Sequence, residues 1–158
     1  MDRYQWLVFL HVTGAFLLLG GIVVVAIFSV AAWRRERPSE IAMLLGLTRW
    51  GLPAISVGML VTLGFGLWLV HDVDYVGWGD AWVVSSLALW VLTGFLGDRG
   101  GRFDRETRAL AKRLAAAGDT PSPELSARLR NPVALALNWG SAFAALAILA
   151  LMIWKPGA

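Results

Sequence analysis

The sequence predicts an all-α polytopic membrane protein: four transmembrane helices in a bundle, with a cytoplasmic amphipathic helix between the third and the fourth. Of the 158 residues, 58% are hydrophobic and 16% are charged, against about 45–50% and about 25% in soluble domains. The mean hydropathy is +0.64. The apolar residues form four blocks without a single Lys, Arg, Asp or Glu: residues 5–33, 50–70, 81–97 and 133–154.

The four blocks have the lengths of membrane-spanning helices. A hydrocarbon core about 30 Å thick needs about 20 helical residues. The blocks 50–70 and 133–154 meet that length, 81–97 is short but adequate, and 5–33 is long enough to tilt or to project. The runs lack the alternating pattern of barrel strands, so helices are expected. We therefore expect residues 1–158 to form one transmembrane domain.

The first block is expected to be retained as a span. In a cleaved signal peptide, positive charge precedes an apolar run of roughly 7–15 residues. Here Arg34, Arg35 and Arg37 follow a much longer run.

Basic residues predict the orientation in the membrane. Segments 34–49 and 98–131 hold 12 of the 14 Lys and Arg residues, whereas segment 71–80 holds none and carries three Asp residues. The positive-inside rule therefore places both basic segments in the cytoplasm and both termini outside. The expected partners are the lipid bilayer and either further membrane subunits or other copies of the chain. A nucleic-acid partner is not expected, because topology accounts for the charge and no reader motif is present.

The loop 98–131 is expected to hold an amphipathic helix over residues 102–117. Its apolar face carries Phe103, Leu110 and Leu114. We expect this helix to lie on the cytoplasmic membrane surface, and docking of a partner is the alternative.

A second, short helix is expected in the same loop. Ser122 followed by Pro123 is typical of an N-cap and a first helical position. The helix should end before Pro132, since proline disfavours helix at the residue before it.

The chain lacks the residue patterns of most catalytic sites. There is no cysteine, so thiolate metal sites, iron–sulfur clusters and cysteine nucleophiles are excluded. The sequence also lacks a phosphate-binding glycine loop, a dinucleotide fingerprint and paired carboxylates within the blocks. No catalytic residue is assigned.

The two histidines, His11 and His71, are the candidate ligands. Counted outward from the cytoplasmic ends of their blocks, they reach similar heights on consecutive helices. Ionisable groups in or beside a span point to function by default, and imidazole binds iron and copper well. We therefore expect both to ligate the iron of a haem b, with Gly14, one turn from His11, leaving room for the porphyrin edge. The alternatives are an exposed interfacial His71, an interhelical hydrogen bond from His11, and close helix packing at Gly14.

The first block also carries a resemblance. Residues 6–21, WLVFLHVTGAFLLLGG, resemble the first helix of a superfamily of small bacterial membrane proteins with the pattern L-H-x-x-(G/A)-A-x-x-x-x-G-G. That superfamily includes the membrane domain of copper-resistance protein D, HemJ-type protoporphyrinogen oxidases and an uncharacterised family of predicted integral membrane proteins. Length, four spans and basic middle loops are most similar to the uncharacterised family. The resemblance implies that His11 is a haem b ligand. It also implies that the protein lies in the cell (inner) membrane of a bacterium.

The leading functional hypothesis is a membrane-embedded haem b protein that transfers electrons near the outer face, alone or within a redox complex. The main alternative is a non-catalytic structural or accessory subunit. Copper handling, with His11, Met1 and Met59 as ligands, and porphyrinogen oxidation are less favoured.

Overall fold

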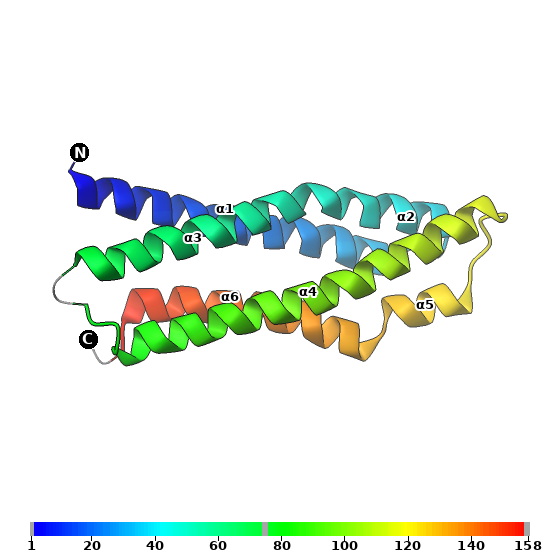
Figure 1. Cartoon of the computed structure of the whole chain (residues 1–158). Helices are drawn as coiled ribbons and strands as arrows, with labels where there is room; N and C mark the ends of the chain where they lie inside the picture. Colours follow the sequence, from blue (N-terminus) through cyan, green and yellow to red (C-terminus); the bar gives the residue numbers. More distant parts are fainter. Residues whose placement is uncertain (1, 74–75, 157–158) are drawn as a thin grey trace.

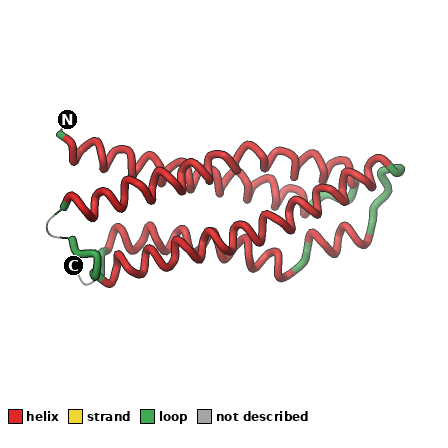
Figure 2. Tube along the Cα trace, in the orientation of Figure 1, coloured by secondary structure: helices red, strands yellow, loops and turns green. Residues whose placement is uncertain are grey.

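The computed structural model is an elongated bundle of helices and describes residues 2–73 and 76–156 (Figure 1). Within these residues it contains helices and loops but no strand, which confirms the all-α prediction (Figure 2). The elements are α1 (Arg3–Trp33), α2 (Pro38–Leu47), the short 3-10 helix η1 (Thr48–Trp50), α3 (Gly51–Asp72), α4 (Ala81–Ala116), α5 (Pro123–Leu129) and α6 (Pro132–Trp154).

The four predicted spans are confirmed as helices. The apolar blocks lie in α1, α3, α4 and α6, and the model has four helical stretches long and apolar enough to cross a membrane. The first and last described residues and the α3–α4 connection lie at one end of the bundle, which we name the termini end (Figure 1). Helices α2 and α5 lie at the opposite end, named the basic end because segments 34–49 and 98–131 are there.

Side-chain caps fix where several helices begin. Asp2 accepts a hydrogen bond from the amide of Gln5 at 2.8 Å, and the Gln5 side chain accepts from the Asp2 amide at 3.2 Å. This reciprocal capping box satisfies amides that the first turn of α1 leaves free. Ser122 caps α5, with Pro123 in the first turn, as the sequence predicted. Asn131 caps α6 in the same way.

The helices pair into two antiparallel hairpins, α1 with α3 and α4 with α6. Glycines allow the first pair to approach closely. A Cβ at Gly21 would lie 2.8 Å from the carbonyl oxygen of Gly51, and one at Gly58 would clash with the backbone of Leu18. Only small residues are compatible with so close a contact.

The two hairpins are joined mainly at the basic end, where α2 packs against α4. The buried cluster there, which we name the basic-end core, consists of Ala32, Ile41, Leu45, Leu110, Ala111, Leu125 and Leu129. It draws on α1, α2, α4 and α5. This end therefore holds an apolar core like that of a small soluble domain.

The loop 98–131 differs from the sequence expectation. The predicted helix 102–117 is not a separate surface helix but the continuation of α4, whose 36 residues extend about 54 Å at 1.5 Å per residue. That exceeds a hydrocarbon core of about 30 Å, so the basic part of α4 projects beyond it. Leu110 packs in the basic-end core, so the apolar face meets its own chain instead of lipid. Residues 102–116 are helical as predicted, but they are not a separate helix on the membrane surface, because α4 continues without a break through Gly97, Gly100 and Gly101.

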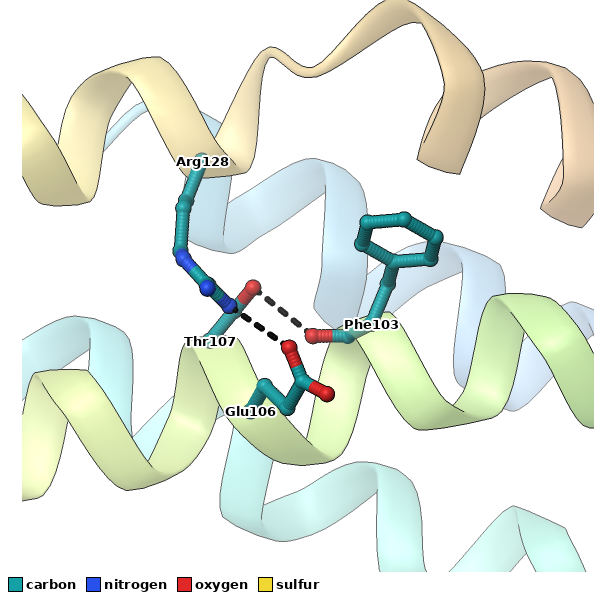
Figure 3. Close-up of polar contacts among 4 residues, drawn as sticks. All are labelled: Phe103, Glu106, Thr107 and Arg128. Atoms are coloured by element: carbon teal, nitrogen blue, oxygen red, sulfur yellow. Dashed lines mark hydrogen bonds and ion pairs between the residues drawn. The ribbon is translucent and has the colours of Figure 1, made fainter.

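An exposed ion pair joins α5 to α4. The guanidinium of Arg128 on α5 donates to the carboxylate of Glu106 on α4 at 3.0 Å (Figure 3). Next to Glu106, the hydroxyl of Thr107 donates to the carbonyl oxygen of Phe103 at 2.8 Å, within α4 itself. Such exposed ion pairs are typically worth about 1 kcal/mol or less. The ion pair orients α5, while burial of Leu125 and Leu129 supplies most of the free energy that holds α5 against the bundle.

Helix α2 was not foreseen and is fixed at its start by Asp119. The Asp119 carboxylate accepts from the Ser39 amide at 2.7 Å and from the Ser39 hydroxyl at 2.6 Å. These hydrogen bonds hold the pKa of the Asp119 carboxyl below its ordinary value. Asp119 has a left-handed φ of 55° beside Gly118, whose φ is 122°, so the turn after α4 is shaped to reach α2.

A candidate ligand cavity between the two hairpins

A cavity of about 480 Å³ lies between the two hairpins toward the termini end. We name it the interhairpin cavity. Its walls come from α1, α3, α4 and α6 and are predominantly apolar, with aliphatic and aromatic side chains. Binding sites for small molecules and cofactors have volumes of about 300–1,000 Å³ and carry few polar groups. The cavity therefore has the size and character of a ligand site.

His11 and Tyr4 are the titratable side chains that α1 contributes to this cavity, and His11 is the one with an imidazole. Its Nδ1 lies 2.8 Å from the carbonyl oxygen of Thr62 on α3. Because a carbonyl oxygen only accepts, Nδ1 carries the proton and donates. In the neutral ring Nε2 then holds the lone pair. This arrangement supplies one basic nitrogen from a ring whose orientation is fixed.

Gly66 makes room for the imidazole. A Cβ at this position would lie 2.9 Å from Cε1 of His11 and 3.1 Å from Nδ1. Real side chains essentially never approach that closely, so the ring rests against bare backbone. Gly66 was among the small residues of the second block, but nothing in the sequence shows which one faces His11.

His71 is placed differently from the sequence expectation. Along the first hairpin, Gly14 lies beside Thr62, His11 beside Gly66, and Arg3 beside Asp72. His71 is therefore level with the first turn of α1, about 7 Å beyond Gly66 along the axis of α3. It is exposed and is not part of the cavity wall. Of the two histidines, only His11 faces the interhairpin cavity.

Gly14 serves helix packing in this arrangement. A Cβ there would lie 2.7 Å from the amide nitrogen of Thr62 and 2.9 Å from Cγ1 of Val61. The space beside Gly14 is thus filled by α3, and Gly14 does not line the cavity. The space that was expected beside Gly14 is found at Gly66.

The α4 wall of the cavity carries hydrogen-bond donors. Trp82, Ser86 and Trp90 are spaced four residues apart, so they share one face of the helix. All three line the cavity, and the indole Nε1 atoms and Ser86 Oγ are buried without a hydrogen-bond partner in the described parts of the chain. A buried donor left unpaired costs about 1–3 kcal/mol. The wall is therefore suited to a ligand with acceptor atoms.

Lys155 brings a positive charge to the mouth of the cavity at the termini end. Its Nζ lies 5.6 Å from the ring centroid of Trp82. Arg3 is also at this end, but it is paired with Asp72 at 2.6 Å. In residues 2–73 and 76–156, no ion pair is found for Lys155.

Comparison with known proteins identifies a family. A family model described as predicted integral membrane protein, DUF2269, matches residues 5–156. The chain belongs to this family. The comparison with curated proteins gave no match, and neither did the comparison with solved structures. Membership confirms the resemblance to a family of predicted integral membrane proteins. The comparisons do not extend to copper-resistance protein D or HemJ-type oxidases.

For this member of DUF2269, the structure also locates the other candidate metal ligands. No group of three or more His, Asp or Glu side chains suited to a metal ion occurs among the described residues. Met1 lies outside the described residues. Met59 directs its terminal methyl toward Gly94 of α4 and does not line the cavity with His11. His11 and Met59 therefore do not line the same cavity.

Sequence reasoning missed Lys155 and the donor face of α4. Lys155 stands alone after the fourth block, where a basic residue is normally a membrane anchor. Trp82 and Ser86 have the four-residue spacing of one helix face, but only the packing of α4 against the other hairpin shows that this face borders a cavity.

Proposed function

We propose that the chain binds b-type haem in the interhairpin cavity, where Nε2 of His11 would hold the iron, and that it serves electron transfer alone or as a subunit of a redox complex. One observation carries the proposal: the Nδ1–H of His11 is held by the Thr62 carbonyl at 2.8 Å. Metal-binding histidines almost always donate their second ring N–H to such a group, which fixes the ring and increases its basicity.

The residues of the cavity fit this group. The walls are apolar and the volume is about 480 Å³, which suits a flat apolar macrocycle. Gly66 leaves room for the Cε1 and Nδ1 atoms of the imidazole. A bound haem would supply a one-electron iron couple, whose potential depends on axial ligands, burial and hydrogen bonding. The chain's own part is to hold the ring of His11 and to exclude water.

A single histidine ligand is favoured over two. His71 is exposed at the end of α3, away from the cavity wall. His11 is the residue on which both the resemblance and the geometry agree. We therefore assign haem binding to His11 and treat His71 as the matched control.

We also propose that the protein lies in the cell (inner) membrane of a bacterium with its basic end in the cytoplasm and both termini outside. The support is the concentration of 12 of the 14 basic residues in segments 34–49 and 98–131. In this orientation the cavity and His11 belong to the outer half of the bilayer.

The test is the absorption spectrum of the detergent-purified protein from cells supplied with a haem precursor. We expect a Soret band in the wild type, loss of haem in His11→Ala, and retention in His71→Ala. Added imidazole should restore binding to His11→Gly. Circular dichroism of each variant reports whether the helices remain folded.

The opposite results are equally informative. If the wild type never retains haem, or His11→Ala keeps the wild-type spectrum, the proposal is wrong. The His11–Thr62 hydrogen bond then serves only to join α1 and α3, and an accessory-subunit role is favoured. A change from low-spin to high-spin spectrum in His71→Ala would instead support the two-histidine prediction.

A further inference from the structure

We infer that the mouth of the interhairpin cavity, formed by Lys155, Trp82 and Ser86, binds a carboxylate of the molecule that occupies it. The inference rests on the proposed function in one respect, since haem is taken as the occupant and its propionates as the carboxylates. The three residues named here are called the acid-binding mouth.

Charge is the first observation. The residues that line the cavity include Lys155 but no Asp or Glu. The neighbouring cation Arg3 is already neutralised by Asp72 at 2.6 Å. Lys155 thus leaves a net positive charge beside an apolar space, where the attraction for an anion is stronger than in water.

Unpaired donors are the second observation. Trp82 and Ser86 are 8% and 6% exposed, and Trp82 Nε1 and Ser86 Oγ have no hydrogen-bond partner in the described chain. An indole N–H can only donate, and a carboxylate oxygen can only accept. Hydrogen bonds to an ionised acceptor are roughly twice as strong as neutral ones. An occupant with acceptor atoms would give these two side chains hydrogen-bond partners, and the ammonium group of Lys155 favours an occupant whose acceptor is a carboxylate.

The backbone at Lys155 is the third observation. Lys155 ends α6 in a left-handed conformation, with φ 40° and ψ 59°, and its amide donates to the carbonyl of Leu151 at 2.9 Å. Glycine is the usual residue at such a helix end. A lysine held there against its conformational preference projects from a fixed point beside Trp82.

The order of groups along the cavity gives the ligand an orientation. Ser86 and Trp90 follow Trp82 at successive turns of α4, each about 6 Å deeper. The acid-binding mouth is therefore at the termini end, and the apolar body of the ligand lies deeper.

The test compares iron protoporphyrin IX with its dimethyl ester, titrated into the purified apoprotein and followed by the Soret band and by quenching of tryptophan fluorescence. Because a hydrogen bond to an ionised acceptor is stronger than one to an ester, the wild type should bind the diacid at least about tenfold more tightly than the diester. Lys155→Met should abolish this preference and Lys155→Arg should restore it. Arg3→Gln, which removes a cation at the same end, should keep it. Comparing the ratio between variants cancels unequal partitioning of the two porphyrins into detergent.

Failure of the inference and failure of the proposed function are distinguishable. If the wild type binds both porphyrins equally, the acid-binding mouth is refuted while haem binding stands. If neither porphyrin binds, the proposed function fails, and palmitate against methyl palmitate tests the mouth directly. A Lys155-dependent preference for palmitate supports the mouth with a different occupant, and no preference refutes it.

Discussion

Replacing Gly66 by alanine should release His11 from its position, whereas the same change at Gly64 should not. The two glycines lie on α3 two residues apart. A Cβ at Gly66 would be 2.9 Å from Cε1 of His11, while a Cβ at Gly64 meets nothing within 4 Å. The pair thus separates the effect of crowding His11 from that of removing a helical glycine.

The expected difference in unfolding free energy between the two variants follows from two opposing contributions. Alanine gains about 1 kcal/mol over glycine within a helix, and both variants receive this gain. In Gly66→Ala the imidazole must move away, which breaks or lengthens the 2.8 Å hydrogen bond to Thr62. The loss is about 0.5–1.5 kcal/mol for the bond, and more where a buried group is left unpaired. We therefore expect Gly66→Ala to be less stable than Gly64→Ala by about 1–2 kcal/mol.

The assay is equilibrium unfolding by SDS in mixed micelles, followed by circular dichroism and tryptophan fluorescence. Haem retention is measured on the same samples, and Gly66→Ala should bind haem more weakly than Gly64→Ala. Equal stability and equal haem retention in the two variants would refute the placement of His11 against Gly66.

Three further predictions concern the rest of the chain. Leu125→Ala removes a side chain that is 1% exposed in the basic-end core, and should cost about 2–5 kcal/mol of unfolding free energy, measured by the same SDS titration; a loss below that range would contradict the packing of α5. The lowered pKa of Asp119 means that its bond to Ser39 stabilises the fold above the ordinary carboxyl pKa and is lost as pH falls through the lowered value. The protection factor of the Ser39 amide, which corrects the exchange rate for its intrinsic pH dependence, should therefore decrease as the pH falls through the lowered pKa, and Asp119→Asn should remove this decrease. Because the chain lacks cysteine, a membrane-impermeant maleimide should label Gly79→Cys in intact cells but Glu36→Cys only after permeabilisation; the reverse pattern would invert the topology.

The spans could be predicted because their determinant is local. A run of about 20 apolar residues must form its backbone hydrogen bonds internally in a bilayer, and a helix does so. The start of α5 could also be predicted, since Ser122 and Pro123 are the N-cap and the first residue of that helix. Helix α2 was missed although Pro38 is a start signal, because the segment was interpreted only by its charge.

The candidate site was predictable only in part, because it depends on the register between helices. His11 stood out as an ionisable residue inside a span. The height of His71 was judged from block ends, yet the contacts of Gly14 and Gly21 with α3 set the actual register. That register pairs His11 with Gly66 instead of His71. The roles of Lys155 and Trp82 depend on how two hairpins meet, which no local pattern specifies.

The basic-end core has a consequence for how the protein assembles. Inside a bilayer, lipid tails are as apolar as the side chains, so helices there gain nothing from leaving water. The basic-end core lies on the part of the bundle that projects beyond the spans, where burial of Ile41, Leu110 and Leu125 removes apolar surface from water. The two hairpins can thus enter the membrane as separate units. They can then associate through the burial of apolar surface at the basic end. We therefore expect insertion to come first and closure from the basic end toward the termini to follow, with the interhairpin cavity forming last.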